Sequence, residues 1–363
     1  MKLKLLFTSV IILTIGIIIV MFIIINEISK ERNIVFNHLD EDYKNAISLL
    51  NNKEYEKCIK LLTKYLSNYP NDAHAYYYRG RANLQIRNYQ YAIENFSKAI
   101  ELQPDSLIYY ENRAEAYLLN QLYQDAINDI QIIKQKSKDT VEISTLLGEA
   151  YYNIGIDEIN NNKYSEALEY STKAIEQNPK KAKFYFLRGC AYEFMKKYNL
   201  AIEDFLKAIY LDPTISEYYT EISQCYFETK NYNKAIEYLN TAIELNTKNH
   251  WAFYLLGLSY YRKGNYKKAL SNFTSAYELK NNKDDYIYAR GNVYLKLKMY
   301  DKAISDYNIA LSLNPSNGNA YFNRGMAFLG KSDFEKAKSD LTQAKKINPH
   351  LSKEVNSILN NIP

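Results

Sequence analysis

The residue types that usually carry out enzyme chemistry are few in this chain and follow no catalytic spacing. No HExxH, GxSxG or phosphate-binding glycine loop is present. The three cysteines form no CxxC pair. The four histidines are scattered, at His38, His74, His250 and His350. We therefore expect no enzyme activity, no catalytic or metal-binding residue and no cofactor.

Arginine and an acidic or amide residue recur sixteen positions apart and could form ion pairs. If each pair bridges two antiparallel helices, the guanidinium and the carboxylate should face each other in a charge-assisted, partly buried contact. We expect a structural rather than catalytic role for them. The pairs are Arg113 with Asp129, Arg188 with Asp204, Arg290 with Asp306 and Arg324 with Asp340, and Arg79 has Asn95 at the same spacing.

The elements that would position these pairs recur every 34 residues. Pro70 and Pro104 have this spacing, as have later prolines. An aromatic residue repeats with it, and a small residue follows three positions later. The aromatic series is Tyr55, Tyr89, Tyr123, Tyr164, Tyr198, Tyr232, Tyr266, Tyr300 and Phe334. Each repeat reads as two helices, with apolar or small residues at i, i+4 and i+7 and a proline after the second helix.

The segments AIENFSKAIELQP (92–104) and AIEDFLKAIYLDP (201–213) carry the resemblance to a known family. A 34-residue helix–turn–helix with these residues resembles the tetratricopeptide repeat (TPR). The resemblance implies an all-α, right-handed superhelix (an α-solenoid) whose first helices line a concave groove. Nine repeats would fill residues 39–349, and residues 350–363 would form a capping helix.

One repeat departs from the period, because Tyr123 and Tyr164 are 41 residues apart. Seven extra residues are about two helical turns, so a longer first helix keeps its buried face in register. We expect one helix over about 143–161 in this fourth repeat.

Aromatic residues also recur at a position that faces the groove in the family. Seven of nine repeats carry one there, in the series Tyr43, Tyr77, Glu111, Tyr152, Phe186, Thr220, Tyr254, Tyr288 and Phe322. Such a ladder suits recognition of an extended peptide or an amphipathic helix. The alternative is that these rings pack against neighbouring first helices.

Repeat seven is the most apolar part of the expected groove. In HWAFYLLGLSYY (250–261), Phe253, Gly257 and Tyr260 form the packed face. A second stripe should face the groove, unless a neighbouring turn buries its tryptophan. This stripe comprises Trp251, Tyr254, Leu258 and Tyr261. Hydrogen bonds to a ligand would come from Arg81, Asn153, Gln224 and Asn292.

The N-terminus predicts a membrane anchor. Residues 5–25 contain no charged side chain and follow Lys2 and Lys4. A helix of this length spans roughly 30 Å of hydrocarbon. We expect a basic flank at 1–4, an uncleaved single-pass signal anchor at 5–26 and a short stem at 27–38, rather than a cleaved signal peptide. The flanking lysines weakly favour a solenoid on the extracytoplasmic side.

The distribution of charge argues against nucleic acid as a partner. The net charge of +5 is spread over short lysine pairs, which argues against nucleic-acid binding. The sequence thus predicts a membrane-anchored scaffold that holds protein or peptide partners in its groove and assembles complexes. The alternative is a homo-oligomer that organises a membrane complex without a peptide ligand.

Overall fold

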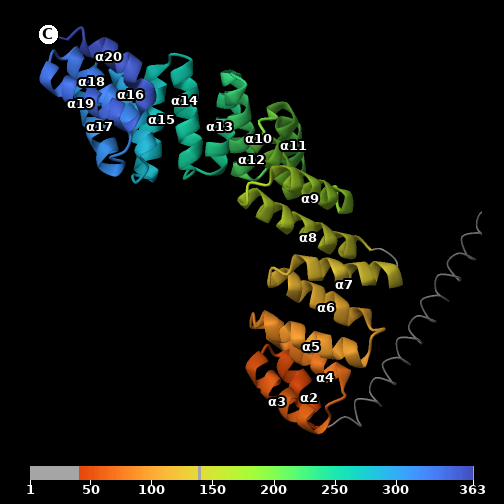
Figure 1. Cartoon of the computed structure of the whole chain (residues 1–363). Helices are drawn as coiled ribbons and strands as arrows, with labels where there is room; N and C mark the ends of the chain where they lie inside the picture. The colour runs from red at the N-terminus through yellow and green to blue at the C-terminus, as the bar shows by residue number, and fades with distance from the viewer. Residues whose placement is uncertain (1–40, 138–139, 363) are drawn as a thin grey trace, which may run out of the picture. The chain divides into compact units, whose positions relative to one another are not determined.

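The computed structural model describes residues 41–137 and 140–362, and these residues form α-helices joined by short turns (Figure 1). Two compact units divide after Ala150. The first contains α2 (Glu41–Asn51), α3 (Tyr55–Asn68), α4 (Ala73–Gln85), α5 (Tyr89–Leu102), α6 (Leu107–Leu119), α7 (Tyr123–Lys136) and the start of α8 (Val141–Asn160).

The second compact unit continues the same alternation. After the end of α8 it contains α9 (Tyr164–Gln177), α10 (Ala182–Phe194), α11 (Tyr198–Leu211), α12 (Ser216–Glu228), α13 (Tyr232–Leu245), α14 (His250–Arg262), α15 (Tyr266–Leu279), α16 (Asp284–Lys296), α17 (Tyr300–Leu313), α18 (Gly318–Gly330), α19 (Phe334–Ile347), the 3₁₀ turn η1 (Pro349–Leu351) and α20 (Ser352–Leu359). Each compact unit is therefore an all-α helical repeat solenoid. A single right-handed superhelix through both units stays a prediction.

Each repeat is a hairpin of two helices. The first helix α4 has 13 residues and the second helix α5 has 14, and the same lengths recur in most repeats. With 20 residues, α8 is seven longer than α4, which accounts for the longer spacing of the fourth repeat. The turn between the two helices places one residue at positive φ, such as Lys230 (62°) or Gly264 (75°). This left-handed residue ends the first helix and lets the chain reverse.

Four hairpins close on a contact between a glycine and a ring, with the pairs Gly80–Phe96, Gly189–Phe205, Gly257–Phe273 and Gly291–Tyr307. A Cβ atom added to Gly189 of α10 would lie 2.6 Å from the ring of Phe205 in α11. Glycine at this place lets the two helices approach until the ring covers the backbone. Phe205 is fully buried as a result.

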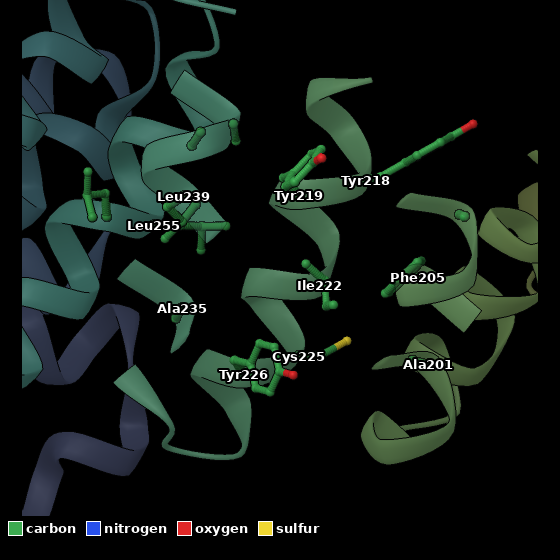
Figure 2. Packing of buried hydrophobic residues seen from close by; sticks show 14 residues of the cluster. Ala201, Phe205, Tyr218, Tyr219, Ile222, Cys225, Tyr226, Ala235, Leu239 and Leu255 are labelled. Atoms are coloured by element: carbon green, nitrogen blue, oxygen red, sulfur yellow. The ribbon is translucent and has the colours of Figure 1, made fainter. Parts of the chain in front are cut away.

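Successive hairpins share one core. Figure 2 shows Ile222 and Cys225 of α12 between Phe205 on one side and Leu239 and Leu255 on the other, and these residues belong to one buried cluster. These hairpins of the second unit therefore bury their apolar faces against one another, as expected for a solenoid. First helices also touch each other, because α12 contacts α14 and α14 contacts α16.

The C-terminal segment covers the last hairpin. Helix α20 packs against α19, and Val355 is fully buried there. A short helix with one apolar face is what a terminal repeat needs, because its outer side has no neighbour to bury it.

None of the helices in the described part of the chain is long and apolar enough to cross a bilayer. The predicted flank, anchor and stem at 1–4, 5–26 and 27–38 lie outside the described residues.

Candidate functional site

The structure brings the four predicted arginine–aspartate pairs together inside their hairpins. In each pair, guanidinium Nε and Nη2 donate to the two oxygens of one carboxylate at 2.7–2.8 Å. The aspartate side chains are almost fully buried, and the arginines are about one-fifth exposed. The hydrogen bonds that Arg188 donates to Asp204 raise the pKa of its guanidinium. These are charged, two-point contacts of high specificity.

Three of these arginines also reach the previous hairpin. Their Nη1 atoms donate to side chains sixteen residues upstream, on the second helix of the preceding repeat. The contacts are Arg113 to Ser97 at 2.9 Å, Arg290 to Thr274 at 3.2 Å and Arg324 to Asn308 at 2.6 Å. Each of these three arginines therefore joins its own helix to two others by hydrogen bonds. This arrangement fits a structural role for the pairs.

Most of the predicted aromatic ladder packs between hairpins. The ring of Phe186 lies 5.6 Å from Phe205 in its own hairpin and 4.8 Å from Tyr218 in the next. Tyr77 is buried in the same way, and Tyr254, Tyr152 and Tyr288 also contact such rings. Their centroid distances are Tyr77–Phe96 6.0 Å, Tyr77–Tyr109 5.2 Å, Tyr254–Phe273 5.8 Å, Tyr254–Tyr286 4.9 Å, Tyr152–Phe184 5.6 Å and Tyr288–Tyr307 5.9 Å. Packing is thus their main contact, and Phe322 of α18 is half-buried.

The polar residues expected to serve a ligand differ in their availability. Asn292 is engaged inside the protein, because its Oδ1 accepts from Tyr307 at 2.8 Å and from Asn323 at 2.8 Å. Arg81 is exposed and lies over the Tyr77 ring at 5.8 Å. Asn153 and Gln224 are half-buried on α8 and α12. Asn292 therefore contributes to packing between helices, and its expected role toward a ligand stays a prediction.

Helix α14 presents two different apolar faces. Ala252, Leu255 and Leu256 are buried against the neighbouring hairpins. Trp251, Leu258 and Tyr261 remain partly exposed, together with Tyr254. The indole of Trp251 lies 5.2 Å from the ring of Tyr254, so the two rings form one surface. We call the residues Trp251, Tyr254, Leu258 and Tyr261 the α14 stripe. Its tryptophan is not sealed by a neighbouring turn.

Acidic side chains gather on α10 and α12, the two first helices that precede α14 in the chain. Glu193 of α10 faces Glu221 and Gln224 of α12. Burial, followed by repulsion from Glu221, raises the pKa of Glu193 to about 8. The pKa of Glu221 is raised to about 7, mainly by burial; the hydrogen bond with Glu193 lowers it and the charge of Glu217 raises it. No arginine or lysine contributes to either shift.

This carboxyl pair makes local stability depend on pH. Because both folded-state pKa values lie above the ordinary 4.5, the folded state holds protons that the unfolded state has lost. Their stabilising effect is complete below about pH 4.5 and is lost as the pH rises through 7 to 8. Hydrogen exchange in α10 and α12, corrected for its intrinsic pH dependence, should therefore show weaker protection at pH 8.5 than at pH about 6. Glu221→Gln should flatten this dependence, and an equally steep profile in that variant would contradict the assignment.

No described group of three or more histidine, cysteine, aspartate or glutamate side chains is placed to hold a metal ion.

Sequence comparison agrees with the repeat architecture. Models described as tetratricopeptide repeat match residues 43–106, 84–139, 148–181, 182–215, 214–282, 285–317 and 318–351. These matches cover well over half of the chain, which therefore belongs to the tetratricopeptide repeat family. Repeats of this family serve as protein-interaction modules. No curated protein matches the chain.

Solved structures show the same fold at low identity. A chain of the APC/C hetero-tetramer Cut9–Hcn1 is 16% identical, with a TM-score of 0.51 over 88% of this chain and 83% of that one. Pseudomonas aeruginosa pilF is 20% identical, with a TM-score of 0.51 over 56% and 92%. The C-terminal part of a TPR repeat-containing protein from Cytophaga hutchinsonii is 21% identical, with a TM-score of 0.50 over 67% and 97%. These similarities establish the fold.

Proposed function

We propose that the chain is a membrane-anchored scaffold that binds segments of partner proteins on the face formed by its first helices. The α14 stripe is the observation that carries this proposal. These side chains pack in part against neighbouring hairpins, but each keeps exposed surface beyond that contact. Exposed aromatic surface gathered on one helix face commonly marks an interaction site. Aromatic residues of this kind dominate the binding energy of protein interfaces.

Acidic groups on the first helices α10, α12 and α16 favour a partner segment with basic side chains. Glu193 and Glu221 repel each other when both are ionised, and Glu217 of α12 and Asp285 of α16 are exposed. A lysine or arginine of the ligand would offset this repulsion while an apolar side chain covers Trp251. An amphipathic helix or extended segment with both features fits this surface.

Trp251→Ala is expected to weaken partner binding at least about tenfold without unfolding the solenoid, because a buried tryptophan anchor contributes about 2 kcal/mol or more. Crosslinking in cells followed by mass spectrometry identifies the partner, and titration of the purified partner measures the affinity. Tyr210→Ala is the matched control, because Tyr210 is 79% exposed on the second helix α11. Unchanged partner affinity in Trp251→Ala, with the circular dichroism of wild type, would remove the proposal.

Sedimentation of residues 36–363 tests the alternative of self-association. A stable oligomer that forms without a partner and dissociates in Trp251→Ala would assign the α14 stripe to contacts between copies of this chain. A monomer supports the scaffold.

The anchor is supported by the uncharged run at 5–25. The full-length chain should stay in the membrane pellet after alkaline carbonate extraction, and a variant lacking residues 1–26 should be released. Protease added outside spheroplasts should digest the solenoid if it lies on the extracytoplasmic side. Extraction of the full-length chain into the supernatant argues against a spanning segment.

A further inference from the structure

Arg79 breaks the pattern of the other hairpin arginines. Arg113, Arg188, Arg290 and Arg324 each face an aspartate, whereas Arg79 of α4 faces Asn95 of α5. Its Nε donates to Asn95 Oδ1 at 2.7 Å and its Nη1 to Thr63 at 3.2 Å. Nη2, which meets a carboxylate oxygen in the other four, has no acceptor among the described residues. Asn95 turns its own amide to the carbonyl of Tyr91 at 2.6 Å.

The charge of Arg79 is consequently left without a counter-ion among the described residues. Burial lowers the pKa of Arg79, whereas the carboxylates raise the pKa of the four paired arginines. Glu56 and Glu94 are nearby, but neither forms an ion pair with this guanidinium within the described part of the chain. A partly buried cation without a carboxylate partner is unfavourable, so an external anion would be stabilised beside it.

Arg79 also lines a cleft large enough for a ligand. The cleft has a volume of about 660 Å³ and lies between α3, α4 and α5. Its walls include Ile59, Tyr76, Ile86 and Tyr91, and the Tyr91 side chain is 61% exposed. Small-molecule sites commonly have volumes of about 300–1,000 Å³ and combine apolar walls with a few polar groups. The cleft is lined by the second helices α3 and α5 together with the first helix α4, and none of the proposed groove residues contributes to it.

We propose that this cleft binds a carboxylate carried by an apolar or aromatic group, with Arg79 as its counter-ion. The carboxylate replaces the aspartate that the other arginine-bearing hairpins supply from α7, α11, α17 or α19. Nη2 of Arg79 donates to one carboxylate oxygen, in the same way that Arg290 Nη2 donates to Asp306. The apolar body lies against Tyr91 and the isoleucines. The ligand is either a small free acid or the C-terminal residue of a peptide.

Calorimetric titration of the full-length chain with N-acetyl-phenylalanine tests this inference. Binding should be at least about tenfold tighter than for N-acetyl-phenylalanine amide, because a charge-assisted hydrogen bond contributes about 1.5–3 kcal/mol. A decapeptide ending in phenylalanine, with a free or an amidated C-terminus, distinguishes the two sources of the carboxylate. Equal affinity for acid and amide, or no binding of any acid, would overturn the proposal.

Asn95→Asp is the decisive variant, because it supplies the missing carboxylate from within. Four hairpins of this chain already carry that arrangement, so the fold is expected to be retained, and binding of the acid should fall at least tenfold. Arg79→Leu should have the same effect, whereas Arg87→Leu, in the exposed turn after α4, should leave binding unchanged. Wild-type affinity in Asn95→Asp would exclude Arg79 as the counter-ion. Because the α14 stripe is untouched, partner binding by the scaffold should be normal in all three variants.

Discussion

Asp306→Ala is expected to destabilise the hairpin of α16 and α17 by about 3–5 kcal/mol, because it leaves the Arg290 guanidinium without its counter-ion. The Asp306 side chain is only 5% exposed and accepts two hydrogen bonds from Arg290 at 2.8 Å. After its removal, solvent reaches the guanidinium only in part, since Arg290 is 19% exposed. Hydrogen exchange of α16 and α17 is the appropriate measurement, because long repeat arrays do not unfold in a single step.

The chain itself supplies the control for this prediction. At the same two places repeat seven carries Leu256 and Asn272. The double variant Arg290→Leu with Asp306→Asn reproduces that combination and leaves no buried charge. Its protection in α16 and α17 should lie within about 1 kcal/mol of wild type, since replacing both partners of a buried pair is often nearly neutral. Equal loss in the single and double variants would mean that packing volume, rather than an unpaired charge, causes the effect.

The ion pairs could be predicted from sequence because two regular spacings determine which residues face each other. A 34-residue period defines the hairpin, and a constant spacing of sixteen joins two places that face each other across it. Where the arginine is missing, the partner is never acidic, as Tyr170 and Tyr238 illustrate. The two-turn insertion of the fourth repeat is equally local, and α8 has the length that the spacing requires.

The aromatic ladder could not be resolved in the same way. Periodicity shows on which side of a helix Phe186 lies, but not whether a ligand or the next helix covers it. The partner is Tyr218, 32 residues downstream, and aromatic residues recur at this spacing for Tyr77 and Tyr254 as well. That recurrence was the feature of the sequence from which packing between neighbouring hairpins could have been predicted. The internal contacts of Asn292 could not be predicted for a similar reason, because its donors Tyr307 and Asn323 come from two other helices.

Phe205→Ala is expected to lower the stability of the hairpin of α10 and α11 by about 3–5 kcal/mol. The ring is fully buried, covers Gly189, and contacts Phe186 at 5.6 Å. Its removal leaves a cavity at the place where α10 and α11 approach most closely. Hydrogen exchange should show the loss in α10, α11 and the adjoining α12, because they share one buried cluster. Leu206→Ala is the control, since that side chain is 40% exposed on the same helix.

The contact between Gly189 and Phe205 should behave as one coupled unit. Gly189→Ala alone should cost about 1–3 kcal/mol, because its Cβ would lie 2.6 Å from the ring. At the corresponding positions repeat three carries Ala114 and Ile130, which are sixteen residues apart and both fully buried. The double variant Gly189→Ala with Phe205→Ile should therefore be more stable than the sum of the two single changes predicts. Strict additivity would mean that the helices separate to admit the methyl group, and that the ring does not set their distance.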